Sequence, residues 1–110
     1  MLKTKLLLIT SVLSLLISPL VYSQSWPNKP IKLVIPFAAG GTTDILGRLL
    51  AQQLAKDLGQ NVIVENKVGA GGNIGAEFVA QSPADGYTIM LASGSMLTVN
   101  PSLYKKLPVN

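Results

Sequence analysis

The chain has 110 residues, of which nine are basic and five acidic, and it contains neither histidine nor cysteine. The lack of cysteine excludes thiol chemistry and cysteine metal sites, and any other metal site would have to rest on five dispersed carboxylates. The basic residues are scattered without aromatic interleaving, so no nucleic-acid partner is expected. No metal ion or cofactor is expected either.

Residues 1–23 have the pattern of a secretory signal peptide. Lys3 and Lys5 precede an apolar run over residues 6–21, and Val21 and Ser23 place small side chains before a cut at Gln24. A transmembrane anchor is the alternative, but the run contains Pro19 and is shorter than the roughly 20 residues that a span needs. Export would leave seven basic residues against five acidic ones, a formal charge of +2.

The exported part opens with an extended lead-in, residues 25–30, which two prolines stiffen and Trp26 is expected to pin. Residues 31–36 then predict a strand, and the continuous apolar run Leu33-Val34-Ile35 indicates that both of its faces are covered.

The segment 37–44, Phe-Ala-Ala-Gly-Gly-Thr-Thr-Asp, connects this strand to a helix predicted over 43–58. Thr42 or Thr43 is expected to cap the helix, Asp44 to lie in its first turn, and Gly59 to end it. Along the helix, leucines four residues apart form an apolar stripe: Leu46, Leu50, Leu54 and Leu58.

The remaining elements follow at short intervals. Residues 61–65 predict a second, buried strand, and Asn73 is expected to cap a second helix that stops at Ser82-Pro83. Tyr87 to Ala92 predict a third strand, and a short helix is expected at 101–105.

Strands alternating with helices predict an α/β fold, with a parallel βαβαβ sheet and right-handed crossovers. In such a sheet the loops after the strands leave at one edge. Residues 37–42, 66–72 and 93–95 are therefore expected to converge on one crevice, where open α/β sheets bind ligands.

The glycines of the first two loops fit an anion site. Gly40-Gly41 and Gly69–Gly72 lead two helix N-termini to the crevice, so backbone N–H groups and neutral side chains would hold a carboxylate without arginine. The alternative is that these glycines only allow tight turns. Asp44 is expected to orient donors, to pair with an ammonium group on a ligand, or simply to complement the helix dipole. Phe37 is expected either to cover one side of a ligand or to fill the turn.

Nucleotide binding and catalysis find little support. No Gly-Lys-Ser/Thr follows either loop, and residues 69–75 have the wrong glycine spacing for a dinucleotide fingerprint. Ser93 and Ser95 have no histidine to activate them, so an enzyme is not expected.

Several motifs together resemble one family, the Bug-type periplasmic solute receptors of tripartite tricarboxylate transporters. The motifs run through residues 25–108 and are Trp26-Pro-x-Lys-Pro-Ile, Val34-Ile-Pro-Phe-Ala-Ala-Gly-Gly-Thr-Thr-Asp44, Leu58-Gly-Gln, Val64-Glu-Asn-Lys, Gly69-Ala-Gly-Gly-Asn-Ile-Gly-Ala76, Pro83-Ala-Asp-Gly-Tyr-Thr88 and Asn100-Pro-x-Leu-Tyr-Lys-Lys-Leu107.

The resemblance implies a periplasmic, monomeric receptor of Venus-flytrap fold that closes on a small carboxylate and delivers it to membrane permease subunits. Carried over from the family's loop motifs, the ligand-binding residues would be Phe37, Gly40, Gly41, Thr42, Asp44, Gly72, Asn73 and Ser93.

Members of that family are much longer than this chain. Residues 24–110 would therefore form an incomplete N-terminal α/β domain, with an unpaired sheet edge, marginal stability and weak ligand binding or none. A truncated, nonfunctional remnant of such a receptor is the alternative, and a Rossmann-type nucleotide-binding enzyme ranks third.

Overall fold

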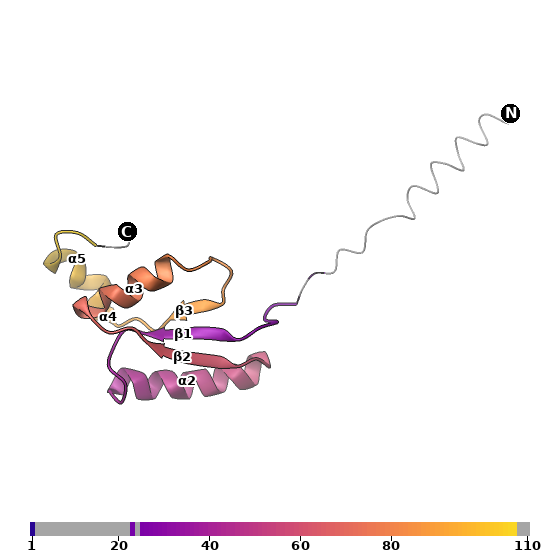
Figure 1. The fold of residues 1–110 in the computed structure, drawn as a ribbon, viewed down its shortest axis with the longest axis horizontal. Helices are drawn as coiled ribbons and strands as arrows, with labels where there is room; N and C mark the ends of the chain where they lie inside the picture. The colour runs from indigo at the N-terminus through magenta and orange to yellow at the C-terminus, as the bar shows by residue number, and fades with distance from the viewer. Residues whose placement is uncertain (2–22, 24, 108–110) are drawn as a thin grey trace.

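The computed structural model describes Met1, Ser23 and residues 25–107 (Figure 1). Residues 2–22 of the predicted signal peptide lie outside the described residues, so that prediction stays untested. The described elements are β1 (Ile31–Ile35), α2 (Thr42–Leu58), β2 (Val62–Asn66), the 3₁₀ turn η1 (Ala70–Gly72), α3 (Asn73–Ala80), β3 (Thr88–Met90), α4 (Gly94–Thr98) and α5 (Asn100–Leu103).

The three strands form one parallel sheet in the order β2-β1-β3. Ile31 pairs with Val62 and Ile35 with Asn66, while Lys32 pairs with Thr88 on the other side of β1. The predicted parallel βαβαβ order is therefore confirmed. The third strand is shorter than residues 87–92, and the second extends one residue further than predicted, to Asn66.

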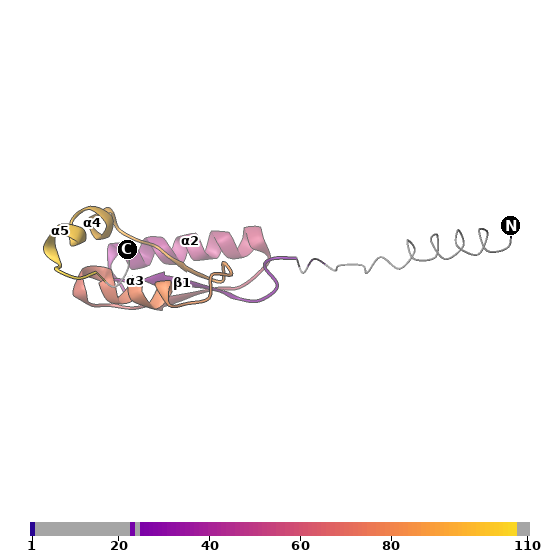
Figure 2. The ribbon, with the colours of Figure 1, turned by 90° about the horizontal axis from the view of Figure 1, so that it is seen from above.

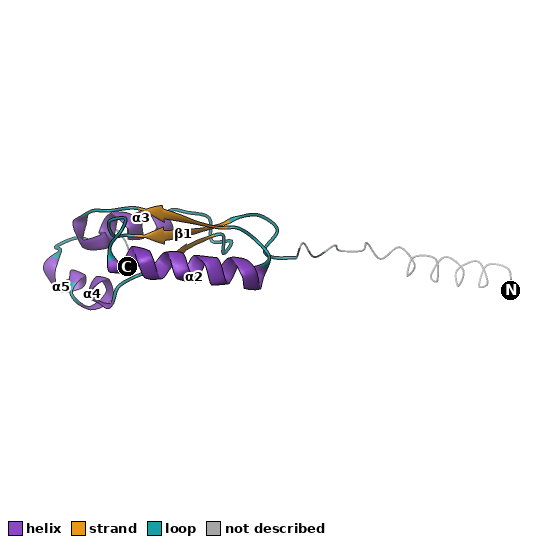
Figure 3. Cartoon of the chain, turned by 90° about the horizontal axis from the view of Figure 1, so that it is seen from below, coloured by secondary structure: helices purple, strands orange, loops and turns teal. Residues whose placement is uncertain are grey.

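The central strand supplies the core. Leu33 and Ile35 pack with Ala51 of α2 on one face of the sheet, whereas Val34 points to the face that α3 covers. Figure 1 shows α2 and α3 on opposite sides of the strands, and Figure 3 shows α2 running alongside them. This confirms the prediction that the first strand is covered on both faces. The second strand, predicted to be buried, is instead a sheet edge on which Ile63 is 56% exposed.

Helix α2 meets the sheet through small residues. A β-carbon on Gly47 would lie 2.3 Å from Cδ1 of Ile35, so a larger residue would require the Ile35 side chain to shift. The buried residues Asp44, Gly47 and Ala51 define the sheet-facing side. Two members of the predicted leucine stripe lie off that side, since Leu46 is 58% and Leu50 41% exposed.

Helix α3 packs on the opposite face, where Gly75 lies against Pro36. The Phe78 ring receives the ammonium groups of Lys32 and Lys67, at 5.0 and 4.5 Å from its centroid. Both lysines also pair with Glu65 at 2.7 Å, and this lowers the pKa of the Glu65 carboxyl.

The lead-in and the last helices lie at opposite ends of the sheet. Trp26 contacts Tyr87 with ring centroids 5.9 Å apart, which confirms its predicted pinning role. Figures 1 and 2 show α4 and α5 at the end toward which the strand arrows point. Helix α4 was not predicted, and α5 spans Asn100–Leu103 rather than 101–105, with Pro101 in its first turn. In the described part of the chain, no helix is long and apolar enough to cross a membrane.

The packing of β1 predicts which isoleucine controls stability. Ile35→Ala removes a fully buried side chain and should cost about 2–5 kcal/mol of unfolding free energy, or abolish the cooperative transition. Ile63→Ala, at an exposed strand position, should cost much less. Urea unfolding followed by circular dichroism measures both, and equal losses would contradict the assigned core.

Candidate functional site

The first two loops after the strands meet at the carboxyl ends of the parallel strands. The N–H of Lys67 donates to the carbonyl of Ile35 at 2.9 Å, and the side-chain amide of Asn66 donates to the carbonyl of Phe37 at 2.9 Å. Helix α5 reaches the second loop, because Nδ2 of Asn100 donates to the carbonyl of Gly71 at 3.0 Å. The predicted convergence of the first two segments is therefore confirmed, whereas the contact with the second loop comes from Asn100 rather than from the predicted third segment, residues 93–95.

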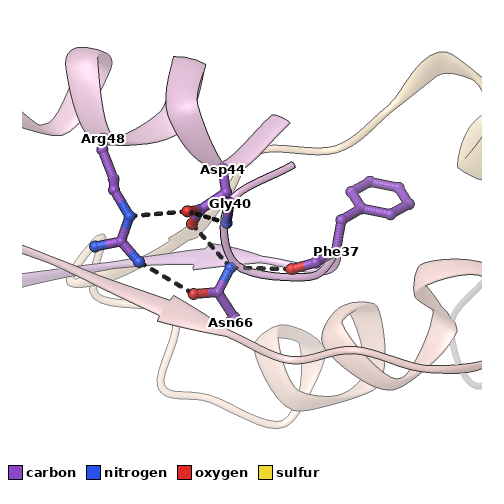
Figure 4. A network of polar contacts seen from close by, with 5 residues as sticks. All are labelled: Phe37, Gly40, Asp44, Arg48 and Asn66. Carbon is purple, nitrogen blue, oxygen red and sulfur yellow. Dashed lines mark hydrogen bonds and ion pairs between the residues drawn. The ribbon is translucent and has the colours of Figure 1, made fainter. Parts of the chain in front are cut away.

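A buried carboxylate organises the first loop (Figure 4). Asp44 is only 3% exposed. Its Oδ2 accepts the N–H of Gly40 and Nε of Arg48, each at 2.9 Å, and its Oδ1 accepts Nδ2 of Asn66 at 2.9 Å. Three donors from a loop, a helix and a strand thus hold one side chain in place.

These contacts keep Asp44 ionised. The hydrogen bond from Arg48 holds the pKa of the Asp44 carboxyl well below its usual range, and the Gly40 N–H and the Asn66 amide lower it further, against the opposing effect of burial. Asp44 in turn raises the pKa of Arg48. Each neutralises much of the other's charge, and both carboxylate oxygens are engaged within the chain, as expected for a residue that orients donors.

The glycine N–H groups of the first loop serve the loop itself. The Gly40 N–H is taken by Asp44, and the Gly41 N–H donates to the carbonyl of Ala38 at 3.2 Å. These two N–H groups were predicted to be donors to a ligand, but both are paired within the loop and helix start.

The open donors lie one step further along the chain, at the start of α2. Gly41 is the N-cap, without a side-chain capping bond, so the predicted cap by Thr42 or Thr43 is wrong because both threonines are already helical. The first helical bond runs from the Ile45 N–H to the Gly41 carbonyl. The contacts described for the chain give no acceptor to the N–H groups of residues 42–44.

The second loop is folded by glycine. Gly69, Gly71 and Gly72 all have positive φ, and a β-carbon on Gly72 would lie 2.6 Å from Sδ of Met96. The Gly72 N–H donates to the carbonyl of Gly69 at 2.9 Å. Gly72 is therefore a buried packing position at the start of α3.

Asn73 does not cap α3, contrary to prediction. Gly72 occupies the N-cap position, and Asn73 is the first residue of the helix. Its Oδ1 instead accepts Nδ2 of Asn100 at 2.9 Å, and both side chains are buried. This contact ties the second loop to α5.

The other predicted residues occupy separate positions. Ser93 precedes α4, and its Oγ lies 2.8 Å from Oγ of Ser95. Phe37 packs partly buried against the core cluster, which favours the turn-filling interpretation, and Figure 4 shows its ring directed away from the Asp44 contacts. Lys67 pairs with Glu65, so its charge is engaged on the α3 side of the sheet.

Two hollows in the described part of the chain have linings that differ from the set of predicted residues. One hollow of about 320 Å³ is lined by Ala70, Asn73, Ile74, Glu77, Tyr104, Lys106 and Leu107. Another of about 300 Å³ is lined by Arg48, Ala51, Gln52, Ala55, Val62 and Val64. Of the eight predicted residues, only Asn73 lines either hollow. Among the described residues, no cluster of three acidic side chains is placed to hold a metal ion.

Three residues that shape this part of the molecule were not among the predicted site residues: Arg48, Asn66 and Asn100. Arg48 follows Asp44 at the i+4 spacing of a helical ion pair. Asn66 continues the alternation of Val62 and Val64, which places all three on the α2 face of the sheet. These two signals were available in the sequence; the contact of Asn100 with Asn73 spans 27 residues and had none.

Comparison with known proteins gives one family. Residues 46–110 match the model of the tripartite tricarboxylate transporter family receptor. The chain is 42% identical to a UPF0065 protein of Bordetella pertussis over 91% of its own length, and 46% identical to protein BugT of the same species over 80%. It spans about 30% of the length of these relatives, 31% and 27% respectively.

Solved structures of proteins similar in sequence to this chain share its fold. A Rhodopseudomonas palustris protein with adipate matches 78% of this chain with a TM-score of 0.74 and 40% identity, over 29% of its own length. MatC from Rhodopseudomonas palustris, with bound malate, matches 59% of this chain with a TM-score of 0.57 and 43% identity, over 22% of its own length.

The lowered pKa of Asp44 makes its contribution dependent on pH. A depressed folded-state pKa stabilises the folded chain above the unfolded value, about 3.9, and this stabilisation is lost as the pH falls further. Asp44→Asn turns an acceptor into a second amide facing Asn66, so it should lower the urea midpoint at pH 7 and at pH 5. The difference from the unchanged chain should shrink at pH 3.

Asp57→Asn is the matched control, because Asp57 lies on the same helix but is exposed. It should change the urea midpoint little at any of the three pH values. A deficit of Asp44→Asn that stays constant down to pH 3 would contradict the buried, ionised state of Asp44.

Proposed function

Because the chain belongs to the tripartite tricarboxylate transporter receptor family, we propose that it supplies the N-terminal part of a periplasmic receptor for a small dicarboxylate. The family consists of transport receptors rather than enzymes, and this sets the Rossmann-type enzyme aside. The receptor delivers its solute to the permease subunits of the transporter, and the predicted signal peptide accounts for its export.

The observation that carries this proposal is the uncapped start of α2. This 17-residue helix begins at the edge of the sheet where the loops converge, and its first three N–H groups have no acceptor among the described contacts. Such a helix start carries partial positive charge and donors aimed in one direction, which suits a carboxylate. Arg48 is held by Asp44, so attraction of the solute falls to these backbone donors.

The solute class comes from the relatives. Two structures with this fold hold adipate and malate, which are dicarboxylates of different length. In the proposed arrangement, one carboxylate of the solute accepts the N–H groups of residues 42–44. The neighbouring loop, residues 67–73, and Ser93 line the approach to it.

Titration of the ¹⁵N-labelled chain tests the class of ligand. Millimolar adipate or malate should shift the amide signals of residues 42–44, because anion binding changes the environment of those N–H groups. Adipamide has the length of adipate without its charge, and it should shift these signals much less. An equal response to adipamide, or diacid shifts confined to residues far from the loops, would contradict the proposal.

A proline tests the backbone donor itself. Thr42→Pro removes one N–H at the first helical position, where proline is tolerated, and Gly41 already has the extended φ of −76° and ψ of 168° that proline requires before it. Loss of a hydrogen bond to a charged group should weaken adipate binding about tenfold or more.

Thr42→Ala keeps the N–H while removing the same side chain, so it should bind adipate within about twofold of the unchanged chain. Amide signals and circular dichroism establish that α2 is intact in both variants. Equal affinities of Thr42→Pro and Thr42→Ala would show that this N–H does not hold the solute.

A further inference from the structure

One side chain joins the first two loops. The amide nitrogen of Asn66 donates to the carbonyl of Phe37 and to Oδ1 of Asp44, each at 2.9 Å, and its Oδ1 lies 3.4 Å from Nη2 of Arg48 (Figure 4). Every polar atom of this side chain therefore faces the first loop or the helix that follows it.

The backbone of Asn66 leads directly into the second loop. Asn66 is the last residue of β2, and the next residue, Lys67, donates its N–H to the carbonyl of Ile35. From this point the chain continues into the glycine loop and α3. A single residue thus fixes where the second loop starts and, through its side chain, where the first loop lies.

The chemistry of asparagine suits this position. Two acceptors, a carbonyl and a carboxylate oxygen, require two N–H donors on one nitrogen, and the amide supplies both. Aspartate has the same shape but no donor when ionised, and it would set a second negative charge against Asp44. Alanine would leave the Phe37 carbonyl and Oδ1 of Asp44 without this partner.

We propose that Asn66 is a positioning residue of the ligand site, which holds the first loop and the start of α2 in register with the second loop so that both loops receive one dicarboxylate. The proposal rests on the proposed function and adds a residue that acts through Phe37 and Asp44 rather than by touching the solute. The Gly40 N–H, bonded to the same carboxylate, reports on the arrangement without any ligand.

The test compares three variants of the ¹⁵N-labelled full chain with the unchanged one. Asn66→Ala removes the amide, and Asn66→Asp preserves its shape should the alanine variant fail to fold. Leu33→Val alters a buried core side chain that makes none of the hydrogen bonds of Asp44, and it should lower stability alone. Two quantities are measured: the hydrogen-exchange rate of the Gly40 amide without ligand, and the Kd for adipate from the amide signals of the folded chain.

Asn66→Ala should speed Gly40 exchange and weaken adipate binding, each about tenfold or more, with the ligand-induced shifts at residues 42–44 reduced more than those at residues 67–73. Leu33→Val should leave the Kd within about twofold, since a purely structural loss does not alter binding by the folded form. Asn66 variants that keep both quantities within about twofold of the unchanged chain would overturn the proposal.

Failure of the proposed function has a different signature. If adipate shifts no loop signal in the unchanged chain, the dicarboxylate assignment fails, and the exchange rate of Gly40 then decides the role of Asn66. Tenfold faster exchange in Asn66→Ala retains Asn66 as the residue that positions the loops, and unchanged exchange rejects it.

Discussion

The arrangement of the loop edge depends on one buried carboxylate. A buried ionised group is tolerated only where donors surround it, and Asp44 receives them from Gly40, Arg48 and Asn66. Gly40 and Arg48 are near in sequence and shape the turn into α2. Asn66 comes from the neighbouring strand, so its hydrogen bond converts a local turn into a contact between two loops.

This internal contact divides the donors of the site into two groups. The N–H groups of Gly40, Gly41 and Gly72 stabilise the loops that contain them. Those of residues 42–44 remain at the start of a long helix, where the backbone dipole favours an anion. Because Arg48 is paired with Asp44, the edge would recognise a carboxylate through geometry rather than through a free cation. Recognition of this kind is compatible with relatives that hold acids of different length.

The elements of the fold were predictable from the sequence because they follow local rules. Apolar runs marked β1 and β3, Gly59 with its left-handed φ ended α2, and short connections between alternating elements required a parallel sheet. The helix caps were predicted wrongly. A threonine or asparagine near a helix start is a good capping candidate, but here the tight glycine turns place Gly41 and Gly72 at those positions.

The details of the site could not be read from the sequence, because they depend on packing between distant segments. Asn73 is buried through its contact with Asn100. Leu46 and Leu50 of α2 lie off the sheet-facing side of the helix, where Gly47 makes the closest approach to the sheet. The alternation that includes Asn66 indicated its face but not its partners.

A double-mutant cycle between Asp44 and Asn66 measures the central contact most directly. The free energy of unfolding is determined for the unchanged chain, Asp44→Ala, Asn66→Ala and the double variant. If the carboxylate and the amide stabilise the fold through each other, the double variant loses clearly less than the two single losses combined. Strictly additive losses would show that the two side chains act independently, and the account of the joined loops would then be wrong.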